Sequence, residues 1–298
     1  MLSALPFTSC LNSDEGNKNE ATLTYGGSYC FNRVTDMQTG ESFISTEPQY
    51  SFLLNYTENL ITPSMSNIRL NGADGSALAF KLPGLKVNVG MQDYSYTCNG
   101  SDITPEGQTQ AYIFDRFSFK VIDRAIKTSN GNYLYSPVYD INYSINNRYS
   151  VIVFPTRYDL LGITSSIADG SDTYTTKDAI YSILLDPKTQ KANITIQDAR
   201  FASGHAYMRI GVKDLPYTIT GAGISIITEQ GQKIQLYDNA GEVKGAYLSD
   251  LNLRINVPSG NASSISFHAN IVGLQGSSQA DEYDVAATLS YYVPSSND

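Results

Sequence analysis

The chain of 298 residues lacks tryptophan and carries only two histidines and three cysteines. It also lacks a run of about 18 apolar residues, so we expect no transmembrane helix. Lys and Arg total 20 against 29 Asp and Glu, which gives a formal net charge of −9, and no basic run occurs. Nucleic acid and anionic lipid surfaces both require clustered positive charge, so we expect neither as a direct partner.

The composition that is present favours a strand-rich globular protein. Hydrophobic residues make up 41% and charged residues 16%, and there are 22 tyrosines. Tyrosine suits half-buried pleated surfaces. Residues 251–257 alternate between apolar and polar side chains, the pattern of a strand with one face on a core and one in water. Asn-Gly pairs at 71–72 and 130–131 supply the residues that tight turns need. No helical apolar stripe occurs, and we predict an all-β fold.

The chain also repeats itself. Eight pairs of similar segments follow one another in the same order, with offsets between 129 (158 minus 29) and 135 (246 minus 111). The first three pairs are residues 29–35 with 158–164, 43–55 with 174–186, and 67–70 with 198–201. A fixed order at a nearly constant offset indicates an internal duplication of one module.

We therefore predict two tandem antiparallel β-sandwich modules related by internal duplication, with small β-barrels as the alternative. The predicted modules span residues 25–155 and 156–298, and the boundary lies near Pro155. Residues 1–24 are expected to be a signal remnant and tether.

Near the N-terminus, a short apolar run ends at Cys10, and the acidic stretch 13–15 follows it. This arrangement resembles the end of a bacterial lipoprotein signal, and the resemblance implies that Cys10 is lipidated and holds the protein on a membrane. The alternative is a flexible N-terminus with an incidental cysteine. Lipidation would leave Cys30 and Cys98, which form either one disulfide or two buried free thiols.

Residues 181–201, running on to 217, resemble uncharacterised two-repeat β-rich lipoproteins of gut Bacteroidetes. The resemblance implies a β-rich fold and a location in the cell envelope, as an outer-membrane lipoprotein on the surface or the periplasmic face. It brings no catalytic residue.

Residues that could perform chemistry are sparse. His205 follows a probable loop and His268 lies on the polar face of a strand-like run, and neither has a second histidine at ligand spacing. The acidic residues Asp169 and Asp172 lack the rest of a Ca²⁺ loop, since Ile180 stands where the closing glutamate belongs. Gly-x-Ser-x-Gly, Ser-x-x-Lys and phosphate-loop motifs are all absent. We expect no catalytic residue, no metal and no cofactor.

Arg69 and Arg200 occupy equivalent positions in the two repeats, two residues after Asn67 and Asp198. They are candidates for a shared ligand site or, as the favoured interpretation, for a hydrogen bond or ion pair inside each module.

These observations favour a non-enzymatic cell-envelope protein that binds a glycan, a protein or a small ligand through loops of its modules. A fimbrial or adhesin-like structural subunit is the alternative. A carboxylate-dependent carbohydrate enzyme ranks below both.

Overall fold

The computed structural model describes residues 19–90, 95–107, 111–122, 125–135, 137–170, 172–220, 223–256, 263–274 and 281–290. Cys10 lies outside these residues. The predicted all-β class is confirmed, because the described part of the chain consists of strands and one 3-10 turn, η1 (Gly27–Tyr29). None of its helical segments is long and apolar enough to cross a membrane.

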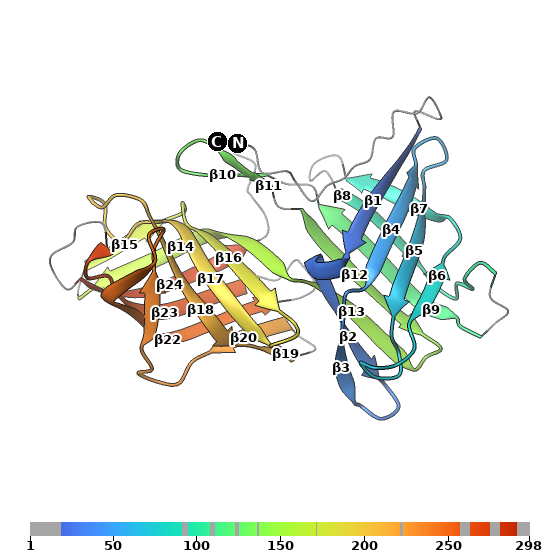
Figure 1. Cartoon of the computed structure of the whole chain (residues 1–298). Coiled ribbons are helices and arrows are strands. Elements are labelled where there is room, and N and C mark those ends of the chain that lie inside the picture. The colour runs from blue at the N-terminus through green and yellow to red at the C-terminus, as the bar shows by residue number, and fades with distance from the viewer. Residues whose placement is uncertain are drawn as a thin grey trace. The chain divides into compact units, whose positions relative to one another are not determined.

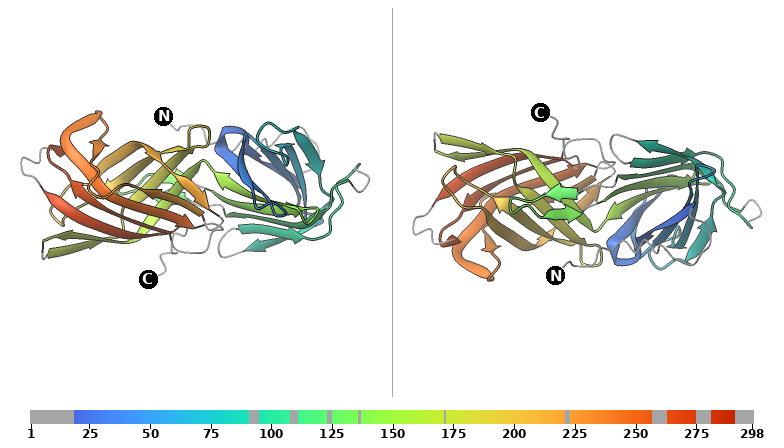
Figure 2. Two further views of the ribbon diagram at one scale, coloured as in Figure 1. Left: turned by 90° about the horizontal axis from the view of Figure 1, so that it is seen from below. Right: turned by 90° about the horizontal axis from the view of Figure 1, so that it is seen from above.

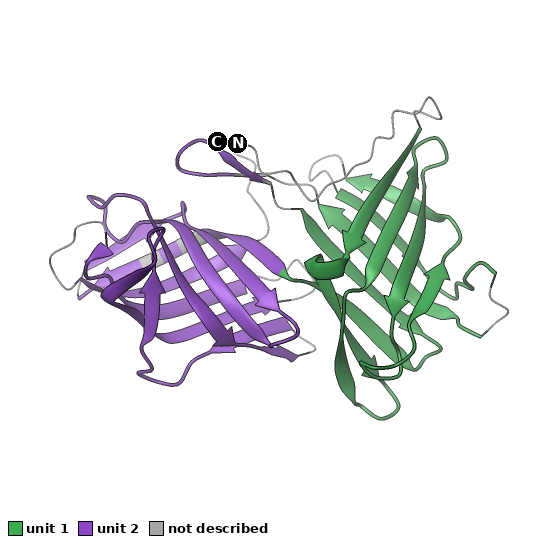
Figure 3. Ribbon diagram, in the orientation of Figure 1, with its two compact units in different colours: residues 1–124, 137–156 green, residues 125–136, 157–298 purple. Residues whose placement is uncertain are grey.

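Two compact units make up the chain (Figure 3). Unit 1 comprises residues 1–124 and 137–156, and unit 2 comprises residues 125–136 and 157–298. The predicted boundary at Pro155 lies two residues before the chain enters unit 2 at Arg157. The short hairpin within residues 125–136 belongs to unit 2 instead of the first module, and Ser129 hydrogen-bonds through N and Oγ to Asp198, at 2.9 and 2.7 Å.

Unit 1 is a curved antiparallel sheet that forms a half-barrel (Figure 1). Its order is β1-β4-β5-β7-β8-β9-β12-β13-β2-β3, and β6 also pairs with β5. Strands β4, β5, β7, β8, β9, β12 and β13 lie side by side in chain order, the arrangement of an up-and-down meander. The strands are β1 (Glu20–Gly26), β2 (Cys30–Asp36), β3 (Ser42–Thr46), β4 (Gln49–Asn55), β5 (Leu60–Ile68), β6 (Leu78–Lys81), β7 (Leu85–Gly90), β8 (Ser95–Gly100), β9 (Phe114–Ile122), β12 (Val138–Ile145) and β13 (Tyr149–Pro155).

Unit 2 repeats this meander and closes it into a barrel (Figure 2). Closure comes from one long strand, β14, whose first half pairs with β16 and whose second half pairs with β24. The strands are β10 (Ala125–Lys127), β11 (Tyr133–Tyr135), β14 (Arg157–Asp169), β15 (Asp172–Thr176), β16 (Ile180–Asp186), β17 (Lys191–Ala199), β18 (Met208–Pro216), β19 (Thr218–Thr220), β20 (Gly223–Ile227), β21 (Ile234–Tyr237), β22 (Glu242–Asn256), β23 (Ser263–Asn270) and β24 (Glu282–Ser290). Of the two architectures expected from the sequence, the barrel describes unit 2.

In unit 1, two separate strands, β1 and β2, take the place that the single strand β14 has in unit 2. β1 pairs with β4, as the first half of β14 pairs with β16, and β2 pairs with β13, as the second half pairs with β24. The break falls at Gly26 and Gly27. A Cβ on Gly26 would lie 2.6 Å from the Pro48 carbonyl oxygen, and Gly27 has a φ of 64°. Residues 20–24, which the sequence analysis assigned to the tether, form most of β1.

Two equivalent irregularities support the duplication. Asn67 and Asp198 share a φ of 56°, a left-handed conformation that Asn and Asp tolerate better than most residues. Each lies where the strand ladder shifts register, between β5 and β6 in unit 1 and between β17 and β18 in unit 2. Such bulges are specific local features.

The structure corrects the first of the predicted repeat matches. Val34 pairs with Phe43, and Ile167 pairs with Tyr174. Since Phe43 and Tyr174 match at an offset of 131 (174 minus 43), Val34 corresponds to Ile167, at an offset of 133 (167 minus 34). The predicted offset of 129 was wrong because residues 158–164 begin in the half of β14 that corresponds to β1.

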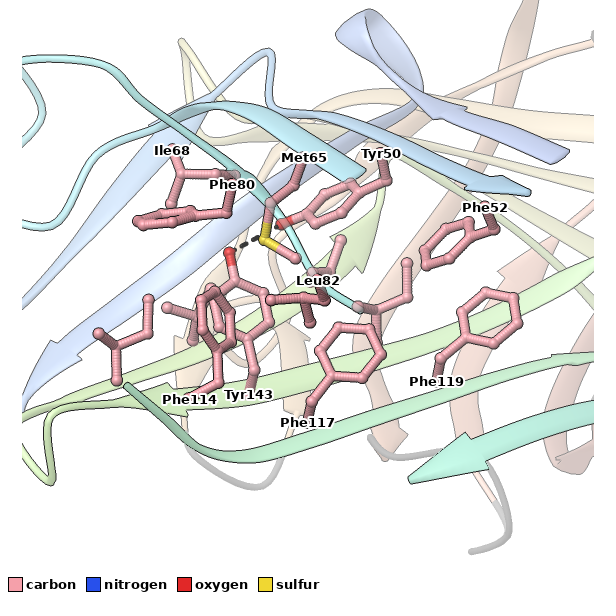
Figure 4. Close-up of a cluster of buried hydrophobic side chains, with 14 of the residues drawn as sticks. Tyr50, Phe52, Met65, Ile68, Phe80, Leu82, Phe114, Phe117, Phe119 and Tyr143 are labelled. Atoms are coloured by element: carbon pink, nitrogen blue, oxygen red, sulfur yellow. Dashed lines mark hydrogen bonds between the residues drawn. The ribbon is translucent and has the colours of Figure 1, made fainter. Parts of the chain in front are cut away.

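Aromatic side chains fill the interior of unit 1 (Figure 4). The rings of Phe52 and Phe119 lie 4.1 Å apart, between β4 and β9, and both side chains are fully buried. Phe114 and Phe117 pack with Tyr143 of β12, with ring centroids 5.4 and 6.3 Å apart. Alternate residues of each strand point into this core, as the period-two pattern predicts.

Phe52 and its neighbour Leu53 provide a test of this alternation. Phe52 is fully buried, whereas Leu53 is 39% exposed on the opposite face of β4. We expect Phe52→Ala to lower the free energy of unfolding by about 3–5 kcal/mol. Leu53→Ala should change it by about 0.5 kcal/mol or less. Urea denaturation of both variants measures the difference, and equal losses would contradict the assigned faces.

Candidate functional site

In the part of the chain that the structure describes, the interiors of the two units offer little room for a ligand. Unit 1 is packed with the aromatic rings described above. In unit 2, a cavity next to Tyr181 and Phe267 has a volume of about 10 Å³. That volume accommodates about one water molecule. A ligand site is therefore to be sought on the outer surface.

The same buried polar contact occurs inside both units. In unit 1, the Tyr50 hydroxyl donates to Asn32 Oδ1 at 2.8 Å and lies 3.2 Å from the Tyr143 hydroxyl (Figure 4). In unit 2, Ser165 Oγ and the Tyr181 hydroxyl lie 3.2 Å apart. Burial raises the pKa of Tyr181 to about 12 and raises that of Tyr50 well above its usual value. The tyrosine hydroxyls are therefore neutral, hydrogen-bonded parts of the core.

Cys30 and Cys98 are two buried free thiols, one of the alternatives expected from the sequence. They belong to β2 and β8, which are not neighbours in the sheet. Burial raises the pKa of Cys98 to about 12 and raises the pKa of Cys30 further. Thiols with raised pKa values carry little thiolate at neutral pH and are weak nucleophiles.

Arg69 and Arg200 each bind the loop that follows their bulge. Arg69 Nε donates to the Gly75 carbonyl oxygen at 3.1 Å. Arg200 donates to the Ser203 carbonyl oxygen, and its guanidinium lies 5.2 Å from the ring centre of Tyr207. Both arginines therefore make hydrogen bonds within their own units, as the favoured interpretation proposed.

A row of Ser249, His268 and Asp284 crosses three neighbouring strands of unit 2. His268 Nδ1 lies 2.9 Å from Asp284 Oδ1, the contact that orients the histidine of a hydrolase triad. However, Ser249 is 5% exposed and its hydroxyl donates to Asp250 Oδ2 at 3.1 Å, while the Asp284 side chain is 80% exposed. The row therefore lacks an accessible serine that hydrogen-bonds to its base. Strand register alone shows the row, so sequence reasoning missed it.

The remaining predicted candidates do not assemble into a site. His205 lies in the loop after β17, with its ring edge-on to Tyr283 at 6.1 Å. Asp169 and Asp172 pair across the β14–β15 turn. Within the described residues, no three His, Cys, Asp or Glu side chains are grouped so that they could hold a metal ion.

The outer surface of unit 2 carries a hollow of about 400 Å³, which we call the outer groove. It crosses β14, β16, β17 and β18 and reaches the end of β21. Among the residues that line it are Arg157, Ser182, Leu184, Asn193, Thr195, Gln197, Arg209, Gly211, Lys213, Tyr237 and Asp238.

The floor of the outer groove is a row of small residues across the strands. Ser182 pairs with Thr195, Thr195 with Gly211, and Gly211 with Tyr237. Gly211 has no side chain, so the centre of this row stays low. A Cβ at this position would lie 3.1 Å from the Ile194 carbonyl oxygen. Side chains two residues away along a strand share its face, so longer side chains flank the row on both sides.

Charge on the walls is mainly positive. Arg157 is neutralised by the buried Asp159, with Nε 2.9 Å from Oδ2. Asp159 also accepts a hydrogen bond from Ser182 Oγ at 2.5 Å. Arg209 donates to the neutral amide oxygen of Asn239 at 3.0 Å, and Lys213 Nζ lies 4.2 Å from the ring centre of Tyr237.

Unit 1 has a corresponding row across its strands, but it lacks the glycine at the centre of the groove floor. Ser51 pairs with Ser64, and Ser64 pairs with Lys81. Lys81 therefore takes the place of Gly211, at an offset of 130 (211 minus 81), and its amine lies 2.6 Å from Glu106 Oε2. Sequence reasoning missed the groove because its polar side chains look like an ordinary solvated strand face. The replacement of Lys81 by Gly211 at the matching position of unit 2 was the signal of the groove that the sequence contained.

Comparisons with protein families, curated proteins and solved structures find no match to the chain.

The buried Tyr181 hydroxyl makes stability depend on alkaline pH. Its raised pKa means that the unfolded chain releases this proton first, so the contribution is complete below about pH 10 and is lost as pH rises towards 12. We expect the difference in unfolding free energy between the wild type and Tyr181→Phe to shrink by about 1 kcal/mol between pH 8 and pH 11. Urea denaturation at both pH values measures it. An unchanged difference would contradict burial of the neutral hydroxyl.

Proposed function

We propose that this protein is an exported, lipid-anchored, non-enzymatic protein of the bacterial cell envelope, and that it binds a saccharide chain through the outer groove of unit 2. The observation that carries the proposal is the row of small residues with Gly211 at its centre, which leaves a hollow of about 400 Å³ on a rigid barrel. Both interiors are filled by their own side chains.

The lining chemistry favours a saccharide. Sugar hydroxyls both donate and accept hydrogen bonds, and the groove offers side chains of both kinds, among them Thr195, Gln197 and Asn193. Asn193 Oδ1 accepts from the Asp214 amide, so its amide nitrogen is the group available to a ligand. The side chain of Leu184 is 51% exposed beside them and supplies an apolar contact for a ring face. A few polar groups with an apolar contact are typical of ligand sites.

The non-enzymatic part of the proposal is supported by the row that contains His268. The described residues bring one serine beside a histidine and a carboxylate, and that serine is buried and donates to Asp250. The buried thiols of Cys30 and Cys98 are likewise unsuited to nucleophilic attack.

A structural, fimbria-like subunit is the second candidate, and one feature favours it. β1 hydrogen-bonds to β4 along its whole length, none of its side chains is fully buried, and it follows the path that unit 2 fills with half of β14. A strand held on one side is the kind of element that a second molecule can replace. Assembly of the purified chain into SDS-resistant ladders would favour this function.

Removal of one hydroxyl from the groove floor tests saccharide binding. Thr195→Val keeps the shape of the side chain and removes one hydrogen-bonding group. We expect the affinity for a saccharide selected on a glycan array to fall about three- to tenfold, the range for one hydrogen bond. Ser64→Ala, at the matching position of unit 1, is the control and should leave titration calorimetry unchanged. Equal effects of the two variants would contradict a site on unit 2.

Lipid anchoring is tested at Cys10. We expect the wild-type chain, expressed in a bacterium with its own leader, to incorporate labelled palmitate and to partition into detergent. Cys10→Ser should abolish both, because an acyl chain supplies about 0.8 kcal/mol of membrane affinity per buried methylene. Cys98→Ser is the control and should retain both properties. Labelling that persists in Cys10→Ser would overturn the proposed anchor.

A further inference from the structure

We propose that the outer groove selects an anionic saccharide, one that carries carboxylate or sulfate groups. This inference rests on the proposed function and adds the chemical class of the ligand.

Two cations face the groove without an acidic partner. Arg209 and Lys213 precede and follow Gly211 on β18 by two residues, so they share its outer face and stand on opposite sides of the floor row. Their Cα atoms are about 13 Å apart at 3.3 Å per residue. Among the ion pairs of the described residues, neither cation has a carboxylate partner. A chain lying along the row passes between them.

The acidic residue of the groove lining, Asp238, and the carboxylate beside Arg157, Asp159, are already engaged. Asp159 is 4% exposed and binds Arg157 and Ser182. Asp238 Oδ1 accepts from the amides of Ala240 and Gly241 at 2.7 and 3.0 Å, which fixes the turn after β21. The ligand therefore meets two uncompensated positive charges in a chain whose net charge is −9. At 0.15 M ionic strength the screening length is about 8 Å, so these near charges dominate over the distant acidic surface.

The positions of both cations are constrained by neighbours. Lys213 lies 4.2 Å from the ring centre of Tyr237, and Arg209 is held by Asn239 at 3.0 Å. Each keeps further N–H donors for a ligand, since an ammonium has three and a guanidinium has five. Cations fixed before binding lose less conformational entropy when they bind an anion.

An acidic polypeptide fits the groove less well than an acidic saccharide. An extended peptide gains affinity by adding a strand to an open sheet edge. At the centre of the floor, however, β18 is paired with β17 on one side and with β21 at Gly211 on the other. Peptide amides lying across these strands would find no backbone partners, whereas sugar hydroxyls match the side chains of Thr195 and Gln197.

Unit 1 provides the internal comparison. Ala79 stands where unit 2 has Arg209, at an offset of 130 (209 minus 79), and Lys81 stands in place of Gly211. The Lys81 amine is paired with Glu106 at 2.6 Å. The floor residue Gly211 and the cation Arg209 have therefore changed together between the two copies, which is the pattern expected of one specialised site.

The test compares polymers of one backbone with and without charge. The full chain would be titrated calorimetrically with polygalacturonate, its carboxyl-reduced neutral form, dextran sulfate, dextran and polyglutamate. We expect binding of polygalacturonate or dextran sulfate, with no binding of the neutral polymers. Arg209→Gln and Lys213→Gln should each weaken binding about tenfold, the effect of losing one charge-assisted hydrogen bond. Lys81→Gln in unit 1 is the matched charge control and should bind like the wild type.

The outcomes separate the inference from the proposed function. Binding of the neutral polymers that equals the acidic ones and is weakened by Thr195→Val would overturn the anionic selectivity and keep the saccharide site. Binding of polyglutamate as tightly as polygalacturonate would overturn the saccharide class. Binding that Lys81→Gln weakens as much as Arg209→Gln, or no binding of any polymer, would overturn both. Unchanged urea denaturation of the variants confirms that each is folded.

Discussion

Each unit depends on one constraint: a single curved sheet must fill its own interior with the side chains that point inwards. In unit 1 the rings of Phe52, Phe119 and Tyr143 meet this requirement, and in unit 2 the cavity next to Tyr181 has a volume of about 10 Å³. Packing at this density leaves little space between the described core side chains. The proposed recognition therefore relies on the outward side chains, whose identities the core does not restrict.

Several parts of this arrangement could be predicted from the sequence. Period-two alternation is a direct consequence of strand geometry, so the all-β class and the inward positions followed from it. The match between Asn67 and Asp198 was also noted in the sequence, and the structure shows a register shift of the ladder at both positions. The closure of the barrel could not be predicted in the same way. It depends on whether one strand continues through two sets of partners, as β14 does, or breaks at Gly26 and Gly27, and this difference is a matter of long-range pairing.

The candidate site was less accessible to sequence reasoning. Arg69 and Arg200 were noticed because they repeat, yet residues that repeat in both copies are those that the fold itself requires. The residues of the outer groove differ between the copies. The position of Gly211 in unit 2 is occupied by a lysine in unit 1, and the position of Arg209 is occupied by an alanine. Their grouping also depends on the register of four strands, which local pattern does not define.

The outer groove depends on Gly211 and Arg209, which the matching positions of unit 1 lack, and this difference has a consequence for multivalency. Although the chain contains two copies of the module, its described residues offer one face of this kind, so one molecule would gain no avidity from its own duplication. A long polymer with a repeating structure would instead be held by several neighbouring molecules, each contributing one contact. With the proposed lipid anchor, the density of the protein on a membrane would set the effective concentration of these contacts and so determine the strength of attachment.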